Sequence, residues 1–210
     1  RTRADEESAA TAATEFTAFL TDYIDARRTD PRDDLIANLI AAEQDGEKLS
    51  TPELITTCIL LLNAGHEATV HSIGNGVKTL LEHGQSAPRD GIEARVEETL
   101  RFDPPLHLFT RYAYDDIELF GHRFKRGDQV GLLLASANRD PDFAADPARF
   151  DPARPIKPNA SFGGGMHFCV GAPLARLELT HALPILFERC PNLSLAEPPL
   201  YADRYHFHGL

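Results

Sequence analysis

A long helical segment in the first half of the chain places the strongest constraint on the fold. Ser50 and Glu53 have the spacing of a capping box, and Pro52 between them suits the first turn of a helix. The pattern that follows predicts one helix over residues 52–83, about 45 Å long at a rise of roughly 1.5 Å per residue. Its first half is apolar on nearly every side, which is typical of a helix buried on all sides. We therefore expect a central helix against which other elements pack.

Shorter patterns predict the remaining elements. Residues 140–159 are rich in proline and show little periodicity, so they predict a loop. Pro184 is expected to kink or shorten the last helix. The fold class is therefore mainly α with minor β. Helices are expected over 8–28, 35–44, 91–102 and 172–188, and strands over 108–112, 117–119 and 129–134.

Composition excludes several classes of protein. The net charge of -11 argues against a nucleic-acid partner, which would need a basic face. Apolar runs such as Ile59 to Leu62 are far too short to span a bilayer, so no membrane segment is expected. Three cysteines at unrelated spacings fit a reducing compartment, and we expect a cytoplasmic protein. The only methionine is Met166, so we do not expect a whole translated protein; a fragment, a processed product and a sequence from which residues have been removed are the alternatives.

A glycine-rich loop over residues 162–173 carries the sharpest chemical signal. Gly163, Gly164 and Gly165 let the backbone approach a flat, bulky group closely. Cys169 lies just before the predicted helix 172–188, and a helix N-terminus stabilises a thiolate. The position therefore favours Cys169 as a nucleophile or a metal ligand.

Spacing alone leaves three interpretations of Cys169 open. The first is a buried, unreactive cysteine beside a glycine loop. The second is a zinc site, but His167 and Cys169 lack a second pair of ligands at regular spacing. The third is a haem iron, which takes a single cysteine as its proximal ligand.

The loop resembles the haem-binding loop of the cytochrome P-450 monooxygenases, Phe-x-x-Gly-x-(His/Arg)-x-Cys-x-Gly. By this resemblance Cys169 is the axial thiolate ligand of the iron in haem b (iron protoporphyrin IX). His167 would face a haem propionate, and Gly163 would contact the cofactor. The positions that match the pattern are Phe162, Gly165, His167, Cys169 and Gly171.

Three arginines complete the resemblance on the haem side. Glu98 and Arg101 resemble the family's Glu-x-x-Arg helix, and Arg154 occupies the place of the later arginine that joins this pair. By resemblance these residues stabilise the core next to the haem, whereas the alternative is an exposed ion pair worth a few tenths of a kcal/mol. By resemblance, Arg111 corresponds to the family's propionate-binding arginine. An arginine suits this role because a guanidinium pairs bidentately with a carboxylate. An ordinary surface arginine is the alternative. His107 and Leu108 nearby would line the distal pocket.

Residues 64–69 (Ala-Gly-His-Glu-Ala-Thr) resemble the oxygen-activation segment, Ala/Gly-Gly-x-Asp/Glu-Thr-Thr/Ser. The resemblance implies that Ala64 and Gly65 leave room over the iron and that Glu67 passes protons inward. Ala68 stands where the family usually has a threonine, and Thr69 lies about 100° further around the helix, so it cannot simply take over. A substrate hydroxyl or ordered water would then complete the relay. Slow, peroxide-leaking oxygen activation and a reaction that depends less on this proton are the alternatives.

The resemblance covers essentially all 210 residues but only the C-terminal half of a typical family member, so the N-terminal half is absent from this sequence. It implies a single P-450 domain over 1–210, with the C-terminal portion of the cytochrome P-450 fold. The implied function is insertion of one oxygen atom from dioxygen into a small organic substrate. Soluble bacterial members usually receive electrons from a ferredoxin and its reductase. A non-catalytic haem-binding domain and a peroxide-driven haem-thiolate enzyme remain as alternatives.

Overall fold

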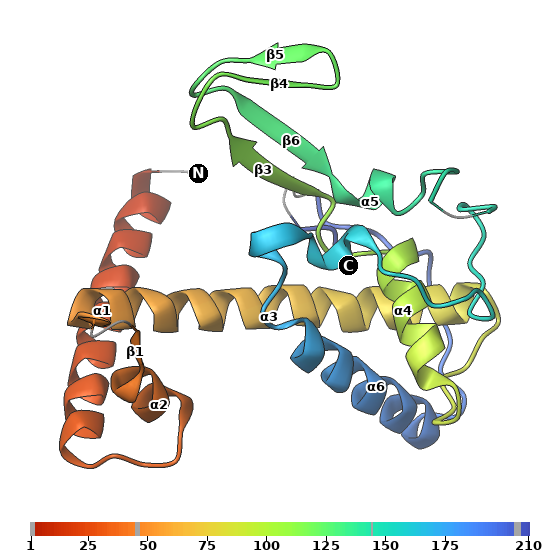
Figure 1. Ribbon diagram of the computed structural model, residues 1–210. Helices are drawn as coiled ribbons and strands as arrows, with labels where there is room; N and C mark the ends of the chain where they lie inside the picture. The colour runs from red at the N-terminus through yellow and green to blue at the C-terminus, as the bar shows by residue number, and fades with distance from the viewer. Residues whose placement is uncertain (1–2, 45–46, 144, 204–206) are drawn as a thin grey trace. The chain divides into compact units, whose positions relative to one another are not determined.

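The computed structural model describes residues 3–44, 47–143, 145–203 and 207–210. The chain divides into two compact units, residues 1–64 and 65–210, and the long helix α3 (Thr51–Glu82) runs through the boundary between them (Figure 1). Each unit has its own apolar core. Both the prediction of a mainly helical chain and that of a minor β component are confirmed.

The first unit forms around two helix starts. Asp34 caps α2: its side chain accepts the Ala37 N–H at 2.9 Å, a bond that lowers the pKa of Asp34 together with the hydrogen bond from Arg27. The predicted capping box starts α3, because the Ser50 N–H donates to Glu53 Oε2 at 2.8 Å. Residues from α1 and α3 then form the core, which contains Leu20, Ile24, Leu54 and Ile55. The elements are α1 (Arg3–Thr29), α2 (Leu35–Ala41), β1 (Glu43–Gln44) and β2 (Glu47–Lys48).

The second unit packs two helices against the C-terminal half of α3. Its core brings together Leu80 of α3, Val96 of α4 and Leu183 of α6 (Figure 1). Two antiparallel pairs, β3–β6 and β4–β5, follow α4 in the chain, and Thr110 pairs with Gly131 in the first. The elements are α4 (Ile92–Phe102), β3 (Leu108–Tyr112), β4 (Ile117–Leu119), β5 (His122–Phe124), β6 (Gln129–Leu133), α5 (Leu134–Ala137) and α6 (Ala172–Arg189).

Several predicted boundaries need correction. The first helix starts at Arg3 rather than residue 8, and α2 ends at Ala41. The strand β5 was not expected, since three residues after a turn give too short a pattern. Pro184 does not shorten α6, which continues to Arg189. Proline removes one hydrogen bond, but Pro184 is fully buried beside Leu183, and this packing offsets the loss.

The prediction that the first half of α3 is buried on all sides is wrong. Leu54 and Ile55 are buried, but the next turns expose 63% of Leu60 and 58% of Leu62. An apolar helix is buried all round only where other elements surround it, and the described residues leave this stretch open to solvent. No helix in the described part of the chain is both long and apolar enough to cross a membrane.

Candidate functional site

The glycine-rich loop folds into two short turns that present Cys169. The turns are η1 (Ala160–Phe162) and η2 (Gly165–His167), and α6 begins directly after the loop. Gly163 and Gly165 have φ angles of 70° and 67°, in the left-handed region that favours glycine. The Cys169 N–H donates to the Phe162 carbonyl at 3.0 Å, which closes the loop. The loop glycines therefore allow a tight turn ahead of the cysteine.

Cys169 is exposed, so the interpretation as a buried, unreactive cysteine is wrong. It lies two residues before Gly171, which caps α6. Met166 and Val170 beside it expose 93% and 86% of their surface, so the thiol opens onto apolar side chains. Among the described residues, Cys169 takes part in no cluster that could hold a metal by protein ligands alone, so nothing supports the zinc interpretation.

Asn138 anchors the start of the loop and was missed by sequence reasoning. Its fully buried amide donates to Ser161 Oγ at 2.8 Å and accepts the Ala160 N–H at 2.7 Å. Ser161 Oγ in turn donates to the Leu100 carbonyl of α4 at 2.7 Å. The bonds tie the loop to α4. A lone asparagine after the short helix α5 gives no sequence signal of this role.

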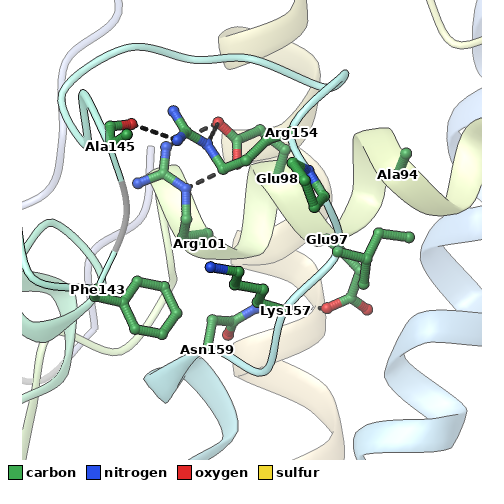
Figure 2. Close-up of a pocket in the computed structure, with 11 residues that line it drawn as sticks. Ala94, Glu97, Glu98, Arg101, Phe143, Ala145, Arg154, Lys157 and Asn159 are labelled. Atoms are coloured by element: carbon green, nitrogen blue, oxygen red, sulfur yellow. Dashed lines mark hydrogen bonds and ion pairs between the residues drawn. The ribbon is translucent and has the colours of Figure 1, made fainter.

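The predicted buried network of Glu98, Arg101 and Arg154 is confirmed, and the alternative of an exposed pair is wrong (Figure 2). Arg101 donates to both oxygens of Glu98, at 2.7 and 2.8 Å, and both side chains are only 4% exposed. The Nε of Arg154 lies 3.6 Å from Glu98 Oε1. Arg101 also donates to the Asn138 carbonyl at 3.0 Å, so the network reaches the residue that anchors the loop.

A cavity of about 260 Å³ borders this network (Figure 2). Glu97 and Glu98 of α4 form part of its wall, and Lys157 and Asn159 of the loop that precedes η1 form another part. Glu98 is paired with Arg101, and Glu97 is paired with Arg176 of α6. The carboxylates of the cavity are therefore already neutralised by arginines of the fold.

The residues of the oxygen-activation segment lie on α3. Ala64 and Gly65 are exposed, and a Cβ at Gly65 would meet nothing within 4 Å. Glu67 is half-exposed, with Oε1 3.7 Å from His71 Nε2. Ala68 and Thr69 are half-buried in regular helix, where neighbouring side chains point about 100° apart. The helical geometry therefore agrees with the expectation that Thr69 does not replace the hydroxyl missing at Ala68.

Arg111 lies on β3 and makes no ion pair with the residues that the structure describes. Its guanidinium donates to the Thr110 carbonyl at 2.9 Å and lies 5.2 Å from the centre of the Phe109 ring. Most of its donors are therefore available for a carboxylate. His107 lies directly before β3, and the centre of its ring is 3.9 Å from that of His208. Burial and the nearby His208 lower the pKa of His107.

The residues of the loop fit a flat apolar group that carries carboxylates. A Cβ at Gly164 or Gly165 would meet nothing within 4 Å, so open space lies beside the backbone there. Exposed Met166, Phe168 and Val170 offer apolar contact around one thiol. Haem combines these properties, since it is flat, takes a single thiolate ligand and carries two propionates.

The comparison with protein families agrees with this chemistry. The family model for cytochrome P450 matches residues 92–197. This chain belongs to the cytochrome P450 family. The match includes the Glu98–Arg101 helix and the whole Cys169 loop, and the resemblance seen in the sequence is confirmed.

Individual P450 proteins are similar over most of the chain. The polyketide biosynthesis cytochrome P450 PksS of Bacillus subtilis is 41% identical over 191 residues, 88% of this chain and 47% of the relative. A vitamin D(3) 25-hydroxylase of Pseudonocardia autotrophica is 42% identical over 185 residues, 85% of this chain and 46% of the relative. The solved structure of PksS superposes with a TM-score of 0.93 at 38% identity, covering 100% of this chain and 56% of that structure. The chain thus has the fold of the corresponding P450 portion and spans about half the length of the curated relatives it matches.

Proposed function

We propose that this chain is the haem-binding, C-terminal half of a single P450 domain. The whole domain would insert one oxygen atom from dioxygen into a small organic molecule. The observation that carries the proposal is the exposed Cys169 thiol at the end of the glycine loop, directly before α6. Haem b, when bound, supplies the oxygen chemistry, and a cysteine thiolate pushes electron density toward O–O cleavage. The named monooxygenases and hydroxylases among the relatives support the same class of reaction.

The residues around Cys169 would hold and orient the cofactor. Arg111 and His167 would offer N–H donors to the propionates, and Gly163, with a φ angle of 70°, would let the backbone approach the ring closely. Phe162 packs against the apolar core and fixes the N-terminal end of the glycine-rich loop. A Cβ at Gly171 would lie 3.8 Å from Cys169 Sγ, so glycine keeps the space beside the sulfur open.

On α3, Ala64 and Gly65 would leave room for dioxygen and substrate, and the Glu67 carboxylate would pass a proton inward. Ala68 has no hydroxyl, so a substrate hydroxyl or an ordered water would complete the path. We further propose a cytoplasmic protein that takes electrons from a ferredoxin and its reductase. The soluble bacterial P450 enzymes that the chain resembles support this choice.

A carbon monoxide difference spectrum tests the cysteine assignment. After reduction with dithionite, the chain with bound haem is expected to give the red-shifted Soret band of a thiolate-ligated iron. Cys169→Ser should abolish this band, whereas Cys190→Ser, which changes another exposed cysteine, should keep it. A band unchanged in Cys169→Ser would overturn the assignment, and no haem binding at all would show that this chain alone is not an enzyme.

Ala68 favours a second candidate, a peroxide-driven haem-thiolate enzyme. Without the hydroxyl usual at this position, delivery of protons to oxygen is weakened, while hydrogen peroxide already carries them. This candidate predicts product from hydrogen peroxide without a reductase, and a lower peroxide-driven rate in Ala68→Thr. Turnover only with a redox partner would exclude it.

A further inference from the structure

Arg176 of α6 and Glu97 of α4 form a partly buried pair beside the Cys169 loop. The Nη2 of Arg176 donates to Glu97 Oε2 at 3.2 Å, and its Nε donates to Glu97 Oε1, so the pair is bidentate. The two side chains expose 35% and 14% of their surface. A bidentate guanidinium–carboxylate pair fixes orientation as well as distance. The pair therefore holds the Arg176 guanidinium in one plane.

That plane lies against the aromatic ring of the loop. The central guanidinium carbon of Arg176 is 4.6 Å from the centre of the Phe162 ring. The carbonyl of the same Phe162 accepts the Cys169 N–H at 3.0 Å. Holding the ring thus also holds the hydrogen bond that places the cysteine.

Glu97 reaches the other end of the same turn. Its Oε2 accepts from Asn159 Nδ2 at 3.4 Å, and Asn159 Oδ1 accepts the Ser161 N–H at 3.1 Å, capping η1. The Glu97–Arg176 pair therefore contacts both Asn159, which caps η1, and Phe162, which ends it.

The hydrogen bond to Glu97 raises the pKa of Arg176. The guanidinium therefore stays positively charged next to the Phe162 ring.

We propose that Arg176, held by Glu97, is a positioning residue for Cys169: it fixes the glycine-rich loop through Phe162. The inference rests on the proposed function, since it concerns the residue assigned as the haem ligand. Lysine would keep the charge but lacks the plane that stacks on a ring and pairs with both carboxylate oxygens. The side chain that positions the cysteine must therefore be arginine.

Hydrogen exchange of the haem-free chain tests the positioning. Arg176→Ala and Arg176→Lys are expected to speed exchange of the Cys169 amide about tenfold, which corresponds to the loss of about 1.4 kcal/mol of interaction free energy. Glu97→Gln should give a smaller increase in the same amides. Arg89→Ala is the control: it removes another bidentate pair to α6, with Glu188 at 2.8 and 2.9 Å, away from the loop. Unchanged exchange of the Cys169 amide in Arg176→Ala would overturn the proposal.

Matching circular dichroism spectra would show that each variant folds. Hydrogen exchange of the Cys169 amide needs no haem, so it can fail while the carbon monoxide spectrum succeeds, and the reverse.

Discussion

At the scale of single residues, Glu98 shows what a buried carboxylate requires. It accepts two hydrogen bonds from Arg101 and one from the Asp151 N–H at 2.8 Å. Taking a charge out of water costs several kcal/mol unless partners replace the lost solvation. The spacing of Glu98 and Arg101 predicts their pairing, because residues three apart share a helix face.

We expect Glu98→Gln to lower the free energy of unfolding by roughly 3–5 kcal/mol, since it leaves Arg101 charged, buried and unpaired. Urea denaturation would measure the loss. Glu188→Gln, which breaks the exposed pair with Arg89, is the matched control and should change stability little. Equal effects of the two substitutions would contradict a buried network.

Asn138 is a residue whose importance depends on contacts distant in sequence. Asn138→Ala removes a fully buried side chain that donates to Ser161 Oγ and accepts the Ala160 N–H. We expect a loss of about 2 kcal/mol in the free energy of unfolding, because the Ala160 N–H and the Ser161 hydroxyl each lose a hydrogen-bond partner. Thermal unfolding of Asn138→Ala, Ser161→Ala and the double variant would measure each loss of stability. We expect the double variant to lose much less than the sum of the two single losses, because both single variants remove the same hydrogen bond. Simple addition of the single effects would show that the two side chains act independently.

At the scale of elements, the C-terminal residues are joined to β3 and to α3 by a stack of rings. His208 stacks on His107 at 3.9 Å and on Tyr201 at 3.8 Å, and Asn75 of α3 donates to the His208 carbonyl at 2.8 Å. Asp103, His107 and His208 bring three potential metal ligands within 4.8 Å. The Lys78 ammonium, 3.4 Å from Asp103 Oδ2, already supplies the positive charge there. The cluster is best explained as a contact between elements.

This stack makes stability depend on pH. Burial lowers the pKa of both His107 and His208; their mutual repulsion and nearby Lys78, Arg139 and His71 oppose protonation, while Asp103 favours it. Groups with a lowered pKa in the folded state stabilise it above the unfolded pKa of about 6.5. The free energy of unfolding should therefore fall as the pH drops below that value.

Denaturant unfolding from pH 8 to 5 measures this dependence. His107→Phe keeps an aromatic ring for the stack but cannot titrate, so it should reduce the slope below pH 6.5, and His208 should account for the rest. His122→Phe, a change at an exposed histidine of β5, is the control and should leave the slope unchanged. A slope that persists unaltered in His107→Phe would exclude this origin of the pH dependence.

At the scale of the whole molecule, two separate cores determine stability. Ile24 is fully buried in the first unit and Leu183 in the second. Ile24→Ala and Leu183→Ala should each cost about 2–5 kcal/mol, from lost transfer energy and the cavity left behind. Hydrogen exchange should show faster exchange of α1 amides for the first variant and of α6 amides for the second. Equal acceleration of both helices by Ile24→Ala would indicate that the units unfold together.

Much of the site could be predicted where its determinants are local. The Cys169 loop, the Glu98–Arg101 spacing and the capping box of Ser50 and Glu53 each depend on residues a few positions apart. Burial could not be predicted in the same way. The apolar pattern of α3 describes Leu54 and Leu60 alike, yet only Leu54 is buried, because other elements surround one and not the other.

The sequence by itself determined the helical class, the family and the position of Cys169, the candidate ligand, directly before a helix, since helix caps, glycine turns and motif spacing act over short stretches of chain. Only the tertiary structure decided which distant side chains support that cysteine. Glu97 and Arg176 lie 79 residues apart, and Asn138 and Ser161 lie 23 apart. Such pairs carry no local pattern, because packing of α4, α6 and the loop brings them together and no spacing rule links them.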